Sequence, residues 1–123
     1  MPDYNTYTPI YLQIMQNIKH AIVSGNWPPG GRVPPVRDLA ASYQVNPNTM
    51  QRALTELERE GLVYSERTAG RFVTGDTGRI AGLRREMADG LLGELFRQLT
   101  FMGYTEEEIR RLMAEWTPPR EKS

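Results

Sequence analysis

Two segments with helical character follow each other with a break of only three residues, and this break constrains the fold more than any other feature. The first segment runs from Val36 to Tyr43, after a pair of prolines that can start a helix. The second begins at Asn46, which favours the N-cap position, with Pro47 at the first helical position. Two helices in such close succession predict a helix-turn-helix.

The flanking segments complete one domain. Upstream, between Thr8–Pro9 and Gly25, isoleucine recurs every four residues, which predicts a core helix with Thr8 as its N-cap. These isoleucines are Ile10, Ile14, Ile18 and Ile22. Downstream, residues 62–65 and 71–74 are short strand-like runs around a polar loop, which predicts a β-hairpin. The order helix, helix, turn, helix, hairpin is that of a winged helix, and we expect it over residues 1–75.

The pattern changes after the breaker at residues 75–78. An apolar stripe with steps of three and four residues then predicts a helix of about six turns. Its members are Ile80, Leu83, Met87, Leu91, Leu95, Leu99 and Met102. Gly103 ends this helix, and Thr105 with Glu108 predicts a capping box that opens a last helix. The stripe is too extended for one short helix to cover, so residues 76–123 are expected to form a helical dimerisation segment, with contacts through residues 79–116.

The expected fold class is therefore α+β and mostly α, with an N-terminal winged helix-turn-helix, a small β-hairpin wing and a two-helix tail.

The amino-acid composition limits the chemistry that the chain can carry out. The chain has no cysteine and one histidine, His20, which excludes disulfides, thiolate metal sites and a histidine-built metal centre. No set of residues suits a nucleophile, a base or a cofactor cradle, so we expect neither an enzyme nor a cofactor. No apolar run approaches the ~20 residues that span a bilayer, so a cytoplasmic protein without a membrane partner is expected.

Charge restricts how the chain can meet a polyanion. Fifteen basic and fifteen acidic residues cancel, so contact with nucleic acid must come from local placement. On the helix after Asn46, apolar residues cluster on one side, while the opposite side carries amides, hydroxyls and one guanidinium, the groups that read base edges in a major groove. Glutamates in its second half would be repelled by phosphate. A solvated surface helix is the alternative. The candidate DNA-binding residues here are Asn46, Asn48, Thr49, Gln51 and Arg52.

Two further places carry candidate cations. Arg37, near the start of the preceding helix, can clamp a phosphate or form a surface pair with a neighbouring aspartate. Arg67 and Arg71 bracket the expected hairpin tip around Gly70, where two cations and a close backbone approach suit a groove or its phosphates. A solubilising loop explains the same composition nearly as well.

A series of short motifs over about the first 75 residues closely resembles the GntR family of bacterial transcription regulators. The motifs are Pro9-Ile10-Tyr11-Leu12-Gln13-Ile14, Pro29-Gly30, Val33-Pro34, Val36-Arg37-Asp38-Leu39-Ala40, Val45-Asn46-Pro47-Asn48-Thr49, Leu57-Glu58-Arg59-Glu60-Gly61-Leu62-Val63 and Gly70-Arg71-Phe72-Val73. The tail, with Gly103-Tyr104-Thr105 and Glu107-Glu108, is similar to the YtrA subfamily, whose members carry a small dimerisation appendage in place of a large effector-binding domain.

The resemblance implies residue roles and a function. Arg37 corresponds to the arginine of the second helix that contacts DNA, residues 46–52 lie on the recognition segment, and Gly70 matches the glycine of the wing tip. Pro35 stands where the family usually has a small hydroxyl residue. In the wing, Thr68 stands where the family usually has a glycine, and Arg71 where it usually has a threonine. The resemblance implies a homodimeric repressor that binds an inverted-repeat operator in double-stranded DNA. It does not assign an effector. The alternative is a winged helix that has lost DNA binding and docks another protein.

Overall fold

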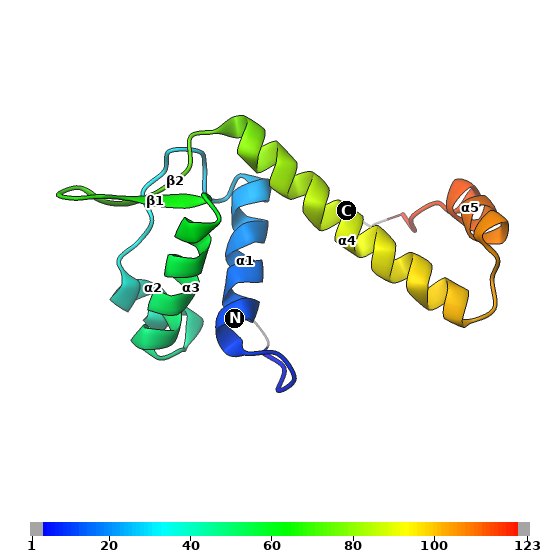
Figure 1. Ribbon diagram of the computed structural model, residues 1–123, viewed down its shortest axis with the longest axis horizontal. Helices are drawn as coiled ribbons and strands as arrows, with labels where there is room; N and C mark the ends of the chain where they lie inside the picture. The colour runs from blue at the N-terminus through cyan, green and yellow to red at the C-terminus, as the bar shows by residue number, and fades with distance from the viewer. Residues whose placement is uncertain (1–3, 121–123) are drawn as a thin grey trace. The chain divides into compact units, whose positions relative to one another are not determined.

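A computed structural model of the chain describes residues 4–120. Over these residues it has five helices and two strands (Figure 1). They are α1 (Ile10–Ser24), α2 (Val36–Tyr43), α3 (Pro47–Arg59), β1 (Val63–Glu66), β2 (Gly70–Val73), α4 (Thr77–Phe101) and α5 (Glu106–Glu115). The predicted α+β, mostly helical class is confirmed. The chain divides into two compact units, one ending at Arg84 and one beginning at Arg85.

The core of the first unit forms where α3 packs against α1 and α2. The periodic apolar residues of α1 and α3 are almost all buried there, as their spacing predicts. The fully buried side chains include Ile14, Ile18, Met50, Ala53, Leu54 and Leu57. Ile10 is the exception, because it is the first helical residue of α1 and remains 44% exposed.

Local signals set the ends of these helices. Asn46 caps α3 as predicted, because its side-chain Oδ1 accepts a hydrogen bond of 2.7 Å from the Asn48 amide. The N-cap of α1 is Pro9 without a side-chain bond, so the prediction of Thr8 was one residue early. α2 ends at Tyr43, and its C-cap Gln44 adopts a left-handed conformation (φ 56°) uncommon outside glycine, which turns the chain into α3.

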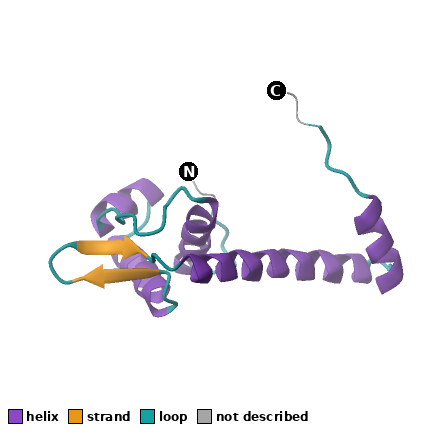
Figure 2. Ribbon diagram, turned by 90° about the horizontal axis from the view of Figure 1, so that it is seen from above, coloured by secondary structure: helices purple, strands orange, loops and turns teal. Residues whose placement is uncertain are grey.

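The wing is the antiparallel hairpin of β1 and β2, in which Val63 pairs with Val73 and Glu66 with Gly70 (Figure 2). Each strand lies one residue from its predicted position, so three residues remain in the loop. Residues 31–33 run along the other edge of β2: the Val33 amide donates to the Arg71 carbonyl and the Val73 amide to the Gly31 carbonyl, both at 2.8 Å. The wing is therefore tied to the segment that leads into α2.

The first two turns of α4 belong to the first unit. Arg79 donates from Nε and Nη2 to the Glu60 carbonyl at the end of α3, at 3.3 and 3.2 Å. Arg84 Nη2 donates to the Val23 carbonyl near the end of α1 at 3.2 Å. Both arginines thus satisfy carbonyls that a helix end leaves unpaired. Two members of the apolar stripe are buried in these turns, Ile80 and Leu83.

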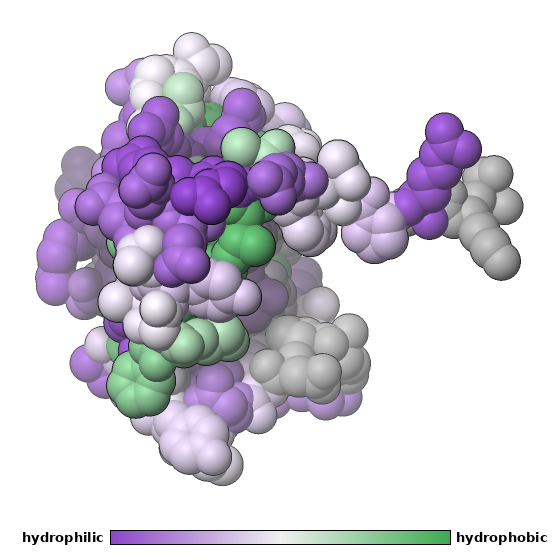
Figure 3. Space-filling view, turned by 90° about the vertical axis from the view of Figure 1, so that its right-hand side faces the viewer, coloured by the Kyte–Doolittle hydropathy of each residue, from purple (hydrophilic) through white to green (hydrophobic). Residues whose placement is uncertain are grey.

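The second unit contains the rest of α4 and α5. The predicted capping box is present: the Thr105 amide donates to Glu108 Oε1 at 2.9 Å, and the Glu108 amide donates to Thr105 Oγ1 at 3.2 Å. The bond from the Thr105 backbone holds the pKa of the Glu108 carboxyl below its ordinary value. Ile109 is buried, whereas many larger apolar side chains of this unit are exposed. Exposed hydrophobic side chains also interrupt the polar surface in the space-filling view (Figure 3).

Candidate nucleic-acid interface

The N-terminal half of α3 presents polar side chains away from the core. Its buried stripe fixes the rotation of the helix, because side chains three and four residues apart share a face. Every polar candidate on this half is exposed except Thr49, which is half-buried. The exposed candidates are Asn46, Asn48, Gln51 and Arg52. The structure therefore places Asn48, Gln51 and Arg52 on one exposed side of α3, with Thr49 on its flank and Asn46 at its N-cap.

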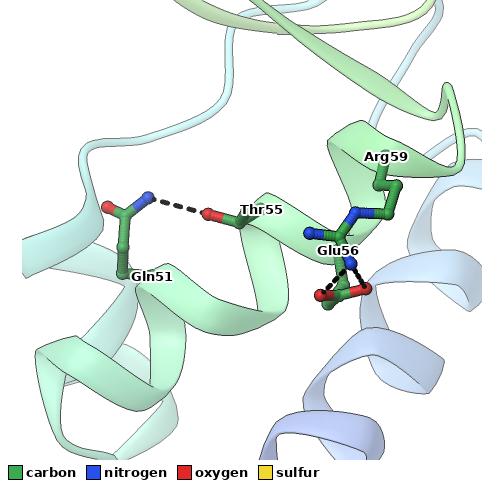
Figure 4. A network of polar contacts seen from close by, with 4 residues as sticks. All are labelled: Gln51, Thr55, Glu56 and Arg59. Atoms are coloured by element: carbon green, nitrogen blue, oxygen red, sulfur yellow. Dashed lines mark hydrogen bonds and ion pairs between the residues drawn. The ribbon is translucent and has the colours of Figure 1, made fainter.

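Hydrogen bonds within α3 orient two of its amides. Gln51 Nε2 donates to Thr55 Oγ1 at 3.2 Å, one turn further along the helix (Figure 4). This bond leaves Gln51 with an amide oxygen and one N–H, the pair of groups that recognises the major-groove edge of adenine. Asn46 uses its side-chain oxygen to cap α3, so its amide NH₂ remains as a donor.

Arg52 is positioned by a neighbouring helix. Its Cζ lies 3.8 Å from the centroid of the Tyr11 ring on α1, within the range of a cation–π contact. A guanidinium stacked on a ring keeps its N–H groups available at the edge, where they can meet a base or a phosphate. Tyr11 is a residue that sequence reasoning missed as a site residue, because the sequence marks it only as a member of the apolar face of α1.

The glutamates in the second half of α3 are neutralised within the first unit. Glu56 accepts hydrogen bonds of 2.9 and 3.2 Å from Arg59 Nη1 (Figure 4). Glu60 pairs with Lys19 at 2.9 Å. Glu58 accepts a hydrogen bond from the Ser65 hydroxyl at 2.6 Å. These carboxylates are engaged away from the polar N-terminal half, which fits a contact with DNA limited to that half.

Arg37 is the second residue of α2 and is exposed. Between residues 4 and 120 it forms no ion pair, so the alternative of a surface pair with Asp38 is not realised. Arg67 lies in the exposed loop of the wing and likewise pairs with no carboxylate of the described chain. Both guanidiniums are available to a phosphate.

Arg71 is less exposed than Arg67. Its side chain is only 18% exposed, and its Nε lies 3.5 Å from Glu58 Oε1 on α3. The sequence placed Arg71 beside the tip because the two arginines flank one loop, but the side chain turns back onto α3. Gly70, where β2 starts, has φ +108°, a conformation that favours glycine and lets the tight turn close.

A third arginine near the wing, Arg32, was absent from the predicted site. Arg32 pairs with Phe72 across an isolated bridge, and its Cζ lies 5.9 Å from the Phe72 ring centroid. It lines a hollow of about 410 Å³ between the wing and the segment before α2. The other lining residues are residues 33–36 and 65–71. The sequence shows Arg32 only as a cation in a loop. Its position beside the wing becomes visible only from the pairing with β2.

The described residues contain no cluster of three or more histidine, aspartate or glutamate side chains that could hold a metal. No helix among them is long and apolar enough to cross a membrane. The site consists of a helix with a polar outer face, one exposed arginine on α2 and a hairpin wing. These features define a winged-helix regulator of transcription.

The chain belongs to the GntR family, because residues 10–73 match the family described as "Bacterial regulatory proteins, gntR family". The uncharacterized HTH-type transcriptional regulator YhcF of Bacillus subtilis is 34% identical over 107 residues, 87% of this chain and 88% of that protein. The HTH-type transcriptional repressor YtrA of the same organism is 42% identical over 72 residues, 58% of this chain and 55% of that protein. The resemblance predicted from the motifs is confirmed, and the relatives are regulators of transcription rather than enzymes.

Solved structures agree with this assignment. A GntR family transcriptional regulator from Listeria monocytogenes superimposes with a TM-score of 0.83 at 32% identity, covering 93% of this chain and all of that one. The DNA-binding domain of AraR, solved in complex with the operator ORR3, has a TM-score of 0.52 at 28% identity and covers 60% of this chain and 90% of that one. The first likeness includes the helical tail, and the second is a domain of this kind bound to DNA.

Proposed function

We propose that the protein is a homodimeric repressor that binds an inverted-repeat operator, with the N-terminal half of α3 of each subunit in a major groove. The observation that carries this proposal is the polar, exposed face of α3 opposite a fully buried stripe. The AraR complex supports the operator as the ligand, and the name of YtrA supports repression. Two subunits also double the number of arginines on one duplex, which compensates for a net charge of zero.

Each proposed contact follows from the chemistry of its side chain. On α3, Gln51 and Arg52 read base edges together with Asn46, Asn48 and Thr49. Arg37 binds a phosphate where α2 crosses the backbone, since it is exposed and unpaired in the described chain. In the wing, Arg67 and the backbone of Gly70 approach the duplex. Arg71 faces Glu58 at 3.5 Å and supports the wing from its inner side.

The dimer is proposed from the second unit. Large apolar side chains of α4 and α5 stay exposed in the single chain, and a hollow of about 530 Å³ lies among Leu95, Leu99, Leu112, Met113 and Trp116. An apolar surface of this kind marks an interaction site. A second copy is the proposed occupant, because α4 continues without interruption from the first unit into this surface and so ties pairing to the recognition helices.

Binding is expected to be specific and sensitive to salt. The experiment is an electrophoretic mobility shift with duplex from upstream of the protein's own gene, compared with random duplex of the same length. Affinity for the inverted repeat is expected to exceed that for random duplex by at least about 1000-fold and to fall steeply with salt, because base contacts and counterion release act together. Equal affinity for both duplexes at moderate salt would reject a repressor.

Replacing Arg37 or Arg52 by alanine is expected to weaken operator binding by about 1 to 3 kcal/mol each without lowering the melting temperature. Both side chains are exposed, so their loss leaves the core intact. Arg59→Ala is the matched control, because it removes an arginine from the far end of α3 that is paired with Glu56. Operator affinities equal to that of the control would refute the assigned roles.

The second candidate function is a winged helix that docks another protein. The net charge of zero favours it, since a polyanion is not attracted over a distance. The exposed amides and guanidiniums of α3 oppose it, because protein-docking patches are enriched in aromatic and apolar groups at their centre. The same mobility shift separates the two functions: this module would bind neither duplex.

A further inference from the structure

The backbone of Arg32 is fixed by the wing. The neighbouring residues Gly31 and Val33 exchange hydrogen bonds of 2.8 Å with Val73 and Arg71 of β2. Arg32 faces Phe72 across this pairing. Although the residue precedes α2 in the sequence, its Cα is held by the hairpin. The position of the Arg32 side chain is therefore set by the wing.

The side chain of Arg32 lies along the outer edge of the hairpin. Its guanidinium rests near the Phe72 ring, and a Cβ placed on Gly70 would lie 3.2 Å from its Nη2. Arg32 is exposed, and no carboxylate between residues 4 and 120 pairs with it. A cation that lies near a ring and is free of a counter-ion can bind an anion without breaking an ion pair.

The hollow beside the wing is positively charged. Its lining contains three arginines, Arg32, Arg67 and Arg71, and one carboxylate, Glu66. The Nε of Arg71 faces Glu58 on α3 at 3.5 Å, although this buried nitrogen forms no hydrogen bond in the described chain. Of the two arginines that remain, Arg67 lies in the loop, and the guanidinium of Arg32 lies beside Gly70, at the end of β2 next to that loop. A backbone phosphate that enters the hollow meets Arg32 without displacing an existing ion pair.

We propose that Arg32 binds a DNA phosphate at the edge of the wing, beside Gly70, and is the wing cation that sequence reasoning assigned to Arg71. This inference rests on the proposed function, because it needs the protein to bind a duplex. It adds a contact to the wing that is supplied by the segment before α2. The contact is with the sugar-phosphate backbone, so it adds affinity without reading sequence.

The test measures fluorescence anisotropy of a labelled inverted-repeat duplex and a random duplex with the full-length protein, at several salt concentrations. The variants are Arg32→Gln, Arg32→Lys and Arg71→Gln. Arg85→Gln is the control for net charge, because Arg85 is an exposed arginine of α4 paired with Asp89. Arg32→Gln is expected to lower affinity by about 10-fold on both duplexes and to reduce the salt slope by about one per subunit. Arg32→Lys is expected to keep the slope and most of the affinity.

Each outcome decides the proposal. If the wild type separates the two duplexes but Arg32→Gln behaves as Arg85→Gln does, Arg32 makes no contact and the proposed function stands. A loss confined to the inverted repeat would assign Arg32 to base reading and overturn the phosphate contact. A larger loss in Arg71→Gln than in Arg32→Gln would return the wing cation to Arg71. If the wild type binds neither duplex, the proposed function and this inference fall together.

Discussion

Replacing Leu91 and Leu95 by glutamate is expected to convert the dimer into monomers and to lower affinity for a full inverted repeat by about 100-fold or more. The two side chains are 70% and 45% exposed in the single chain, so the change leaves its core intact. A dimer would bury them, and burying one leucine contributes about 1.5–3 kcal/mol. In a symmetric dimer each leucine is buried once in each subunit, so its contribution counts twice. The loss of dimerisation free energy therefore exceeds the ~2.7 kcal/mol that corresponds to a 100-fold change in affinity.

The control is Gln98→Glu, which adds one negative charge, half of that added by the double variant, at an exposed polar position of α4. Light scattering at micromolar concentration is expected to report a dimer for the wild type and for the control, and a monomer for the double variant. The double variant is expected to keep its affinity for a half-site duplex, because the recognition helix is unchanged. A wild type that is monomeric in this measurement would contradict the proposed dimer.

The local elements were predictable because their signals lie close together in the sequence. Asn46 and Pro47 act on the turn of helix that they begin, and Thr105 acts on the amide three residues later. The buried stripe of α3 follows from helical geometry alone, so the polar outer face that carries the proposed function was visible before any tertiary structure.

The orientation of individual arginines was not predictable, since it depends on residues distant in sequence. Arg71 was expected at the wing tip, but Glu58 of α3 draws it inward. Arg52 is exposed as expected, but its contact with the Tyr11 ring of α1 could not be read from the sequence. Arg32 lies beside the wing because residues 31–33 pair with β2, which the sequence did not indicate. Long side chains follow the charges and rings that the fold brings within reach, and no local pattern encodes those partners.

The buried and exposed sides of α3 therefore have separable roles, and the buried side is expected to give the largest change in stability. Leu54→Ala is expected to lower the free energy of unfolding by about 2–5 kcal/mol, because Leu54 is fully buried and its truncation leaves a cavity. Urea unfolding followed by circular dichroism measures this change. Protein concentration is held fixed, since the stability of a dimer depends on it.

Arg59→Ala is again the matched control, because it shortens an exposed side chain of the same helix and removes an ion pair worth about 1 kcal/mol or less. Leu54 is two residues from Arg52 along α3, on the opposite face. Its loss is therefore expected to weaken operator binding near the unfolding transition, whereas Arg52→Ala weakens binding at every temperature. If Leu54→Ala costs less than about 1 kcal/mol, then α3 is not anchored through this stripe, and the rotation that presents its polar face to DNA has lost its physical basis.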